Sequence, residues 1–403
     1  MPDTPTTPAA GGKRICMLTH SFYESDNRVI RYAETLAQRG DSVEVFAIRR
    51  SPDTPKEETI AGVKVFRIQD RFSKDRQSKS ADFLWPLLRF LVVSSWWITR
   101  RHIRRLYHLV HVHNIPDFLV FAAWYPKLTG AKVMLDIHDI VPELFGSKFK
   151  VPDRSVLVWG LKIVEKLSAA FANRVILSNH LWLEKYTARS ARREKCSVFI
   201  NHVDGRIFYP RQPARLDSKP VIMFPGGLQW HQGVDIAIQA FAKLRRHLPD
   251  AEFHIYGDGN RKPELVALAQ ELGLNGSVRF FSPLRIGQIA DVMAGADLGV
   301  VPKRADSFGN EAYSTKIMEF MSLGVPTVVS STKIDRYYFD DSVVRFFESG
   351  NPDALAGAMF DVLSNDELRR GMVARASEYV SRNSWDTRKN DYLKLVDSLC
   401  RRN

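Results

Sequence analysis

VPKRADSFGNEAYSTKIMEFMSLGVPTVVSS, residues 301–331, carries the pattern on which the fold prediction depends. An apolar strand ends near Val301, a polar loop follows, and a helical pattern runs from about Ser314 to Leu323. A second apolar run, PTVVSS, comes after the turn at Gly324. Strand, helix and strand in this order form a right-handed βαβ unit, and such units build parallel sheets.

The same alternation recurs on both sides of this stretch. Strands are expected at 14–19, 42–48, 63–68, 108–113, 131–137, 174–179 and 197–200, and then at 220–224, 251–256, 277–281, 297–301, 326–331 and 342–347. Asp26 can cap a helix over 27–39 that Gly40 ends, and helices are expected over 233–247 and 261–272. Each half therefore predicts an α/β domain with a parallel sheet. Ligands bind such domains where strand ends and helix N-termini supply unpaired amides.

Domain boundaries follow from length and composition. A chain of 403 residues exceeds what one hydrophobic core usually organises, which favours two domains. Turn-forming residues and two prolines mark 206–219 as a linker. We therefore expect a flexible tail at 1–12, domains at 13–205 and 220–384 that face each other across a cleft, and a C-terminal helix at 385–403 that returns to the first domain.

The composition excludes several classes of protein. With 45% hydrophobic and 26% charged residues, the chain is not disordered. Cys16, Cys196 and Cys400 are far apart and form no CxxC pair, so neither a disulfide framework nor a zinc site is indicated, and a reducing, cytoplasmic compartment fits. The first residues lack the apolar core of a signal peptide, and no run of 18 apolar residues occurs. The net charge of +13 favours a polyanionic partner.

The quoted stretch also contains groups suited to a phosphorylated, hydroxyl-rich ligand. Glu311 and Glu319 are eight residues apart, so one precedes the helix and the other lies inside it. Each carboxylate can accept hydrogen bonds from two adjacent hydroxyls, as on a ribose or a hexose. Lys316 adds a positive charge in the first turn, where helix amides attract phosphate; the amides concerned belong to Ala312, Tyr313, Ser314 and Thr315. The alternative is a capped surface helix with ordinary exposed acids.

These residues resemble the nucleotide-sugar site of glycosyltransferase family 4, a large retaining group with the GT-B fold of two Rossmann-like domains. The family motif is Glu-x(7)-Glu followed by Gly and a Pro-Val-Val element, and here Glu311, Glu319 and GVPTVV at 324–329 are similar to it. The resemblance implies that Glu311 contacts the donor sugar and that Glu319 holds the ribose hydroxyls. Residues 312–314 replace the usual Gly-Phe-Gly, which leaves the sugar open. The Thr-Lys pair at 315–316 resembles the subgroup with Ser/Thr-Lys before the second Glu.

The resemblance extends over nearly the whole chain. PVIMFPGGLQWHQG, from residue 220, is similar to the glycine loop of the family's donor domain, so Gly226 and Gly227 are donor-binding candidates. Gly257 is expected beside the nucleotide base. The Arg and Lys that usually bind phosphate in this loop are replaced here by Gly227 and Gln232.

Other cations must then bind the donor phosphates. Lys316 is expected first, as a catalytic residue that stabilises the leaving diphosphate. Lys303 and Arg304 are donor-binding candidates as well, although a solvated loop explains them equally well.

Candidates in the first half are fewer. LDIHDIVPELF follows the strand at 131–137, and the resemblance makes His138 the active-site histidine near the reacting sugar. A metal site of Asp136, His138, Asp139 and Glu143 is the weaker alternative, and no metal is expected. Asp26 can cap its helix, and with Arg28 it is also assigned to the acceptor side, although the residues themselves favour an exposed or ion-paired Arg28.

A basic and aromatic segment suggests contact with a membrane. Ten Lys or Arg residues lie between 67 and 105, interleaved with aromatic residues, and 83–107 has the spacing of an interfacial helix that meets an anionic membrane surface. The alternative is a domain helix that packs its aromatic side chains inward. Because many relatives extend glycans on polyprenyl-diphosphate lipids, the resemblance favours the membrane.

The sequence therefore predicts a retaining, metal-independent glycosyltransferase without a cofactor. It would move a sugar from a nucleotide-sugar donor to a glycan or polyprenyl-diphosphate-linked acceptor in surface polysaccharide biosynthesis, in the cytoplasm at the inner face of the cell membrane. A catalytically inactive GT-B homologue acting as a scaffold is the alternative, favoured by Gly227 and Gln232. A nucleic-acid partner is not expected, because only the net charge suggests one.

Overall fold

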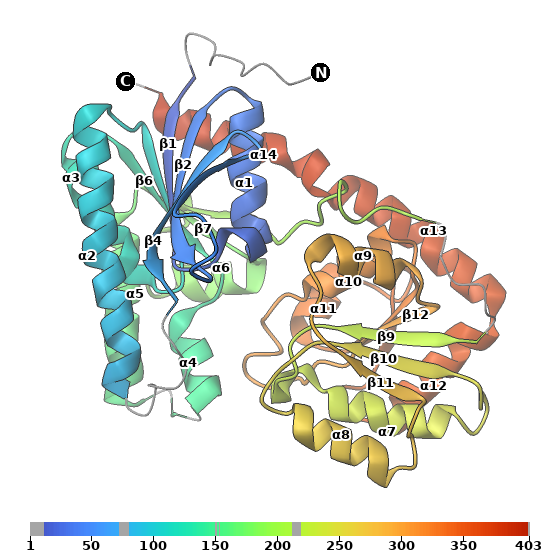
Figure 1. Cartoon of the computed structure of the whole chain (residues 1–403). Coiled ribbons are helices and arrows are strands. Elements are labelled where there is room, and N and C mark those ends of the chain that lie inside the picture. Colours follow the sequence, from blue (N-terminus) through green and yellow to red (C-terminus); the bar gives the residue numbers. More distant parts are fainter. Residues whose placement is uncertain (1–11, 72–79, 150, 153, 212–218, 402–403) are drawn as a thin grey trace. The chain divides into compact units, whose positions relative to one another are not determined.

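The computed structural model describes residues 12–71, 80–149, 151–152, 154–211 and 219–401 (Figure 1). The chain divides into two compact units: one holds the described residues up to Ile200 and those from Lys389 onward, and the other is Asn201–Arg388. The boundary thus lies at 200, whereas the sequence placed it at 205. Helix α14 (Trp385–Cys400) contributes residues to both units. Most of the expected tail, 1–11, and half of the expected linker, 212–218, lie outside the described residues.

The first unit contains an eight-stranded sheet in the order β3-β4-β2-β1-β5-β6-β7-β8. Its strands are β1 (Arg14–Thr19), β2 (Ser42–Arg49), β3 (Glu57–Ile60), β4 (Val63–Asp70), β5 (Leu109–His113), β6 (Lys132–Ile137), β7 (Arg174–Leu177) and β8 (Cys196–Val198). All expected strands are present and pair in parallel, and one further strand that the sequence did not predict lies at the edge of the sheet. There β3 pairs antiparallel with β4. Glu57, Glu58 and Thr59 are exposed, so β3 has no buried apolar run by which the sequence could reveal it.

The helices of this unit are α1 (Asn27–Gln38), α2 (Ser80–Arg104), α3 (Trp124–Leu128), α4 (Val141–Phe149), α5 (Val156–Phe171) and α6 (His180–Thr187), with short 3-10 helices η1 (Tyr23–Ser25), η3 (Asp117–Ala123) and η4 (Arg193–Lys195). Asp26 caps α1, and Gly40, with φ of 95°, follows its end. Helices α1 and α14 lie side by side (Figure 1), and Tyr32 stacks on Tyr392 with ring centres 4.2 Å apart. Within the described residues, no helix is both long and apolar enough to cross a membrane.

The second unit contains a six-stranded parallel sheet in the order β11-β10-β9-β12-β13-β14. Its strands are β9 (Val221–Pro225), β10 (Glu252–Tyr256), β11 (Val278–Phe281), β12 (Leu298–Val301), β13 (Thr327–Ser330) and β14 (Arg345–Phe347). The helices are η5 (Trp230–Gln232), α7 (Val234–Leu244), α8 (Lys262–Glu271), α9 (Ile286–Ala294), α10 (Thr315–Ser322), α11 (Lys333–Tyr338), α12 (Pro352–Ser364) and α13 (Asp366–Asn383). Buried residues of β9, β10 and β12 pack with those of α7, α8 and α12 in one core.

Each sheet has one switch point, where the order of strands along the sheet reverses. It lies between β1 and β5 in the first unit and between β9 and β12 in the second. Loops from the two adjacent strands leave in opposite directions there, which opens a crevice outside the carboxyl ends of the strands. The two switch points are therefore the places to look for binding groups.

Candidate active site

Two glycines shape the switch point of the second unit. Gly226 follows β9 with φ of 141°, and a Cβ there would overlap Cε of Lys316 from α10. A Cβ at Gly257, after β10, would overlap the carbonyl oxygen of Gly226. Glycine at both positions therefore lets the two loops approach each other and brings Lys316 to the strand ends.

Lys316 has unusual surroundings for a lysine. Its Nζ donates to Oε1 of Gln232 at 3.0 Å and lies 5.4 Å from the centre of the Phe224 ring. Burial lowers the pKa of Lys316 to about 8, although nearby Glu319 acts in the opposite direction. An ammonium group that has lost water and faces a neutral amide interacts strongly with an incoming anion. Gln232, which stands where the family usually has a phosphate-binding lysine, thus contacts the lysine expected to replace it.

Lys303 is not in a solvated loop, and that alternative is wrong. Its side chain is buried, and its Nζ pairs with Oδ2 of Asp335 at 2.9 Å and donates to the carbonyl oxygen of Ala312 at 2.7 Å. The hydroxyl of Thr332 holds Asp335 by donating to the same carboxylate at 2.6 Å. Lys303 therefore ties the loop before α10 to the start of α11, and its positive charge already has a partner.

Arg304 also has a partner within the protein. Its guanidinium pairs with Asp235 and lies 4.7 Å from the ring centre of Trp230, while its Nε donates to the carbonyl oxygen of Trp230 at 3.1 Å. These contacts hold η5 against the loop after β12. Of the three predicted phosphate-binding cations, Lys303 and Arg304 are therefore each paired with an aspartate, whereas Lys316 donates to a neutral amide.

The start of α10 is the second feature of this switch point. The helix begins at Thr315 with Ser314 as its N-cap, within one residue of the expected start. Ser314 makes no side-chain capping bond, and its buried hydroxyl has no hydrogen-bond partner in the part of the chain that the structure describes. Since the first amides of a helix lack intrahelical partners, this N-terminus keeps the donors that bind phosphate. Glu311 precedes the helix and Glu319 lies inside it, and both are half-buried.

Ala312 and Tyr313, which precede this helix, make contacts within the protein that the sequence did not predict. The amide of Ala312, predicted to bind phosphate, donates to the carbonyl oxygen of Phe308 at 2.8 Å and is therefore already used. The Tyr313 ring packs edge-on against Tyr338, with ring centres 5.1 Å apart. Packing thus accounts for the Tyr313 side chain, and a donor contact by it stays a prediction.

The switch point of the first unit contains Asp26. Its carboxylate accepts hydrogen bonds from the amide of Val29 at 3.2 Å and from Oγ of Ser21 at 2.7 Å. Burial alone would raise the pKa of Asp26, but His138, His113 and these hydrogen bonds leave it below its ordinary value. The carboxylate is therefore held ionised as a helix cap, and its acceptor role stays a prediction.

Arg28 is buried and ion-paired, which agrees with one of the two expectations for it. Its Nε and Nη2 donate to the two carboxylate oxygens of Asp136 at 2.8 and 2.7 Å, and its Nη1 donates to the carbonyl oxygen of Phe199 at 2.7 Å. The side chains of Arg28 and Asp136 are only 3% and 0% exposed. Burial would raise the pKa of Asp136, but Arg28 and His138 hold it well below its usual range. Arg28 thus neutralises a buried carboxylate, and its assignment to the acceptor side stays a prediction.

His138 follows β6 and is anchored through both its backbone and its ring. Its amide donates to Oδ1 of Asn114 at 2.7 Å, and its carbonyl oxygen accepts from Oγ of Ser178 at 2.8 Å. Its Nε2 lies 3.2 Å from Oδ2 of Asp136, and its side chain is 20% exposed. A histidine fixed in this way presents the exposed side of its ring in one orientation, as a residue that acts on a substrate requires.

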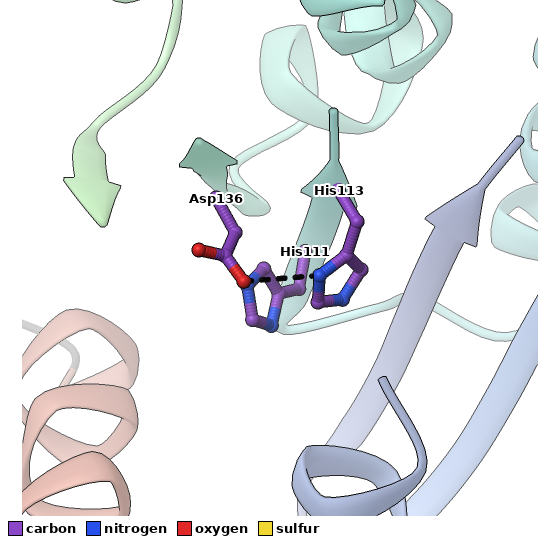
Figure 2. Close-up of side chains that lie close together, drawn as sticks. All are labelled: His111, His113 and Asp136. Atoms are coloured by element: carbon purple, nitrogen blue, oxygen red, sulfur yellow. Dashed lines mark hydrogen bonds and ion pairs between the residues drawn. The ribbon is translucent and has the colours of Figure 1, made fainter. Parts of the chain in front are cut away.

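His111 and His113 form a metal-like cluster with Asp136, shown in Figure 2. Candidate ligand atoms of the three residues lie within 4.8 Å of one another. However, both oxygens of Asp136 accept hydrogen bonds from the Arg28 guanidinium, which is already the counter-cation. Nδ1 of His111 lies 3.1 Å from the Tyr392 hydroxyl, and Nδ1 of His113 lies 3.1 Å from Asp136 Oδ2. These residues do not fit a metal ion, and we interpret them as a buried polar network that supports His138.

The metal set considered from the sequence is not assembled. Glu143 pairs instead with Arg189 through two bonds of 2.6 and 2.8 Å. Sequence reasoning also missed Asn114 and the two histidines of β5. The available signal was the repeated His in LVHVH, because polar side chains at alternate positions of a buried strand face one side.

Two family models match the chain. The model described as "Glycosyl transferase 4-like domain" matches residues 26–202, and the model described as "Glycosyl transferases group 1" matches residues 206–379. The chain belongs to the group 1 glycosyltransferases. This confirms the family resemblance, whereas the subgroup with Ser/Thr-Lys before the second Glu stays a prediction.

Known proteins resemble this group 1 glycosyltransferase over part or most of its length. It is 28% identical over 190 residues to the D-inositol 3-phosphate glycosyltransferase of Corynebacterium urealyticum, a match that covers 45% of this chain and 44% of that protein. The match thus spans less than half of that relative. The protein of the same name from Segniliparus rotundus is 27% identical over 383 residues, covering 89% and 81%.

A crystal structure confirms the predicted fold class. The structure of Anabaena HepE in complex with UDP-glucose matches with a TM-score of 0.73 at 16% identity, covering 96% of this chain and 99% of that one. The fold is GT-B, built here from two α/β units with largely parallel sheets.

Proposed function

We propose that this glycosyltransferase is a retaining enzyme that moves a sugar from a nucleotide-sugar donor to a glycan or lipid-linked acceptor in surface polysaccharide biosynthesis. The observation that carries the proposal is the start of α10, where an uncapped helix brings Lys316 to the glycine loop at a switch point. Phosphate binds where helix amides and a cation converge. The complex of Anabaena HepE with UDP-glucose supports a nucleotide-sugar as the donor.

The proposed reaction requires charge stabilisation more than proton transfer. The bond between the anomeric carbon and the donor phosphate breaks, the acceptor oxygen bonds to that carbon from the same face, and the departing phosphate takes the acceptor proton. Lys316 and the amides of α10 would stabilise the developing negative charge. Glu319 would hold the ribose hydroxyls and Glu311 the sugar. The proposal includes neither a metal nor another cofactor.

In the first unit, we propose that His138 acts at the reacting sugar and that Asp26 belongs to the acceptor side. The anchoring of His138 by Asn114, Ser178 and Asp136 supports this role, because a fixed imidazole loses little entropy on contacting a substrate. Arg28 acts indirectly, by holding Asp136.

The proposal places the protein in the cytoplasm at the inner face of the cell membrane, attached through 83–107. Support comes from the exposed side chains of Arg100 and Arg104 on the same helix as exposed Trp85 and Trp96, since basic and aromatic groups together suit an anionic lipid surface. We propose no nucleic-acid partner.

A panel of sugar nucleotides tests the proposal, first by thermal shift and then by release of nucleoside diphosphate. A donor should raise the melting temperature, and its turnover should collapse in folded Glu311→Gln and Glu319→Ala proteins. Glu271→Gln, at an exposed glutamate of α8, is the matched control and should behave as wild type. If no sugar nucleotide raised the melting temperature at a saturating concentration, the hypothesis of an inactive scaffold protein would replace that of an enzyme. Normal turnover in both variants would reject the site.

A further inference from the structure

Helix α2 exposes an apolar stripe on the side opposite to its core contacts. Trp85, Leu88, Val92, Trp96 and Ile103 are between 39% and 68% exposed. Their spacing places them along one side of the helix, whereas Phe90, Ser94 and Ile98 on the other side are completely buried. Single exposed apolar residues are ordinary, but a contiguous stripe marks an interaction surface.

Helix α5 carries a second stripe of the same kind. Val156, Trp159, Ile163 and Leu167 recur at helical spacing and are between 37% and 84% exposed. Both α2 and α5 pack against η3, so the two stripes belong to one flank of the first unit.

A cavity of about 690 Å³ opens on the α2 stripe, where α2 meets η3 and α3. Its volume lies in the range of about 300–1,000 Å³ that is typical of ligand pockets. Its apolar walls come from six residues, Leu91, Val92, Trp96, Ile103, Phe121 and Trp124. A hydrocarbon chain matches such walls, since its burial is favourable by about 0.8 kcal/mol per methylene.

The polar groups that line the cavity indicate which head group its ligand would carry. Arg100 and Arg104 line it with exposed side chains, and neither has an acidic partner among the described residues, while the Arg100 guanidinium lies 5.1 Å from the centre of the Trp96 ring. The hydroxyl of Thr99, also in the lining, is buried with no hydrogen-bond partner in the same part of the chain. The remaining hydroxyl, of Ser95, already accepts from Nε1 of Trp124 at 3.0 Å. Two cations without an acidic partner and one unused donor above apolar walls fit an anionic head group on an apolar chain.

We propose that this cavity binds the hydrocarbon chain of one anionic membrane lipid, with Arg100 and Arg104 at its phosphate. The inference rests on the membrane association proposed above and adds a discrete site to it. A second copy of this chain is a poorer occupant, because a symmetric contact would bring the same arginines of two molecules together. An anionic lipid instead supplies the opposite charge.

Decyl phosphate, used below its micellar concentration, is a soluble probe of the cavity. Calorimetry should show saturable one-to-one binding by the wild-type protein, no binding of inorganic phosphate, and weaker binding of decanol. Val92→Trp should fill the cavity while keeping the stripe apolar, and should weaken decyl phosphate binding about tenfold or more. Val156→Trp makes the same change at an exposed valine of α5 outside the cavity and should bind within about twofold of wild type.

The arginines are tested separately. The double variant Arg100→Gln, Arg104→Gln should bind decyl phosphate only as tightly as it binds decanol. Its affinity for decanol should equal that of the wild-type protein. Equal binding of decyl phosphate by wild type and Val92→Trp would overturn the proposal. Self-association that Val92→Trp abolishes, in a protein that binds no decyl phosphate, would also overturn it and assign the cavity to a second copy.

Flotation on vesicles containing phosphatidylglycerol separates this site from the function on which it rests. Binding of decyl phosphate without flotation would support the cavity and reject membrane association. Val92→Trp should release nucleoside diphosphate at the wild-type rate. A wild-type protein that binds decyl phosphate but transfers no sugar would count against the proposed reaction and not against the lipid site.

Discussion

The two switch points of this glycosyltransferase differ in whether their buried cation has a charged partner. In the first unit, Arg28 and Asp136 neutralise each other in a buried pair that also supports His138. In the second, Lys316 faces the neutral side chain of Gln232 beside the uncapped start of α10. A buried ion pair is already neutral, whereas a buried cation that donates to a neutral amide can still pair with an anion. The comparison predicts that breaking the Arg28–Asp136 pair impairs folding, whereas replacing Lys316 impairs donor binding and turnover.

Arg28→Met should have the largest effect on stability. It leaves the Asp136 carboxylate buried without its counter-charge, which costs about 3–5 kcal/mol of unfolding free energy. Urea denaturation measures the loss, and adding Asp136→Leu to the variant should recover much of it. Unchanged stability with a raised KM for the acceptor would instead show that Arg28 contacts substrate, and the comparison would fail.

Lys316→Met should have the largest effect on turnover. Removing one preorganised group that stabilises developing charge costs about 10²–10³-fold in kcat. Stability should hold within about 1 kcal/mol, because burial already disfavours the charged form. Release of nucleoside diphosphate and denaturation together test this, with Lys394→Met, an exposed lysine of α14, as the control. If Lys316→Met instead unfolded the protein, Lys316 would stabilise the fold, as Arg28 is expected to do.

The pH dependence of donor binding sharpens the role of Lys316. Its pKa is about 8 in the free protein, so the ammonium form is complete well below pH 8 and declines as the pH rises through that value. We expect kcat/KM for the donor to fall by up to about tenfold per pH unit above pH 8, and Lys316→Arg to shift the decline upward because arginine stays protonated. An unchanged profile in Lys316→Arg would assign the decline to another group.

Arg304→Gln should have the smallest effect. Arg304 shares its charge with Asp235 and stacks on Trp230, so its loss should raise the donor KM by about twofold to threefold, through local loosening of η5. Steady-state kinetics measures this change. An effect as large as that of Lys316→Met would place Arg304 on the donor phosphate.

Much of the fold is readable from local pattern. The expected strand at 14–19 coincides with β1, and the helix expected from about Ser314 starts at Thr315. Apolar periodicity reports which residues meet the core, so buried parallel strands are visible in the sequence. The exposed edge strand β3 lacks that signal and was missed.

The chain's own sequence determined the βαβ rhythm, the two-unit organisation and the group 1 motif around Glu311 and Glu319. Tertiary structure alone decided which charges are neutralised. Arg28 meets Asp136 across 108 positions of sequence, and Lys303 after β12 meets Asp335 of α11, whereas Lys316 donates to the neutral amide of Gln232. Periodicity describes a residue's neighbours within one element, but charge pairing depends on contacts between distant elements, and only the folded chain brings those together.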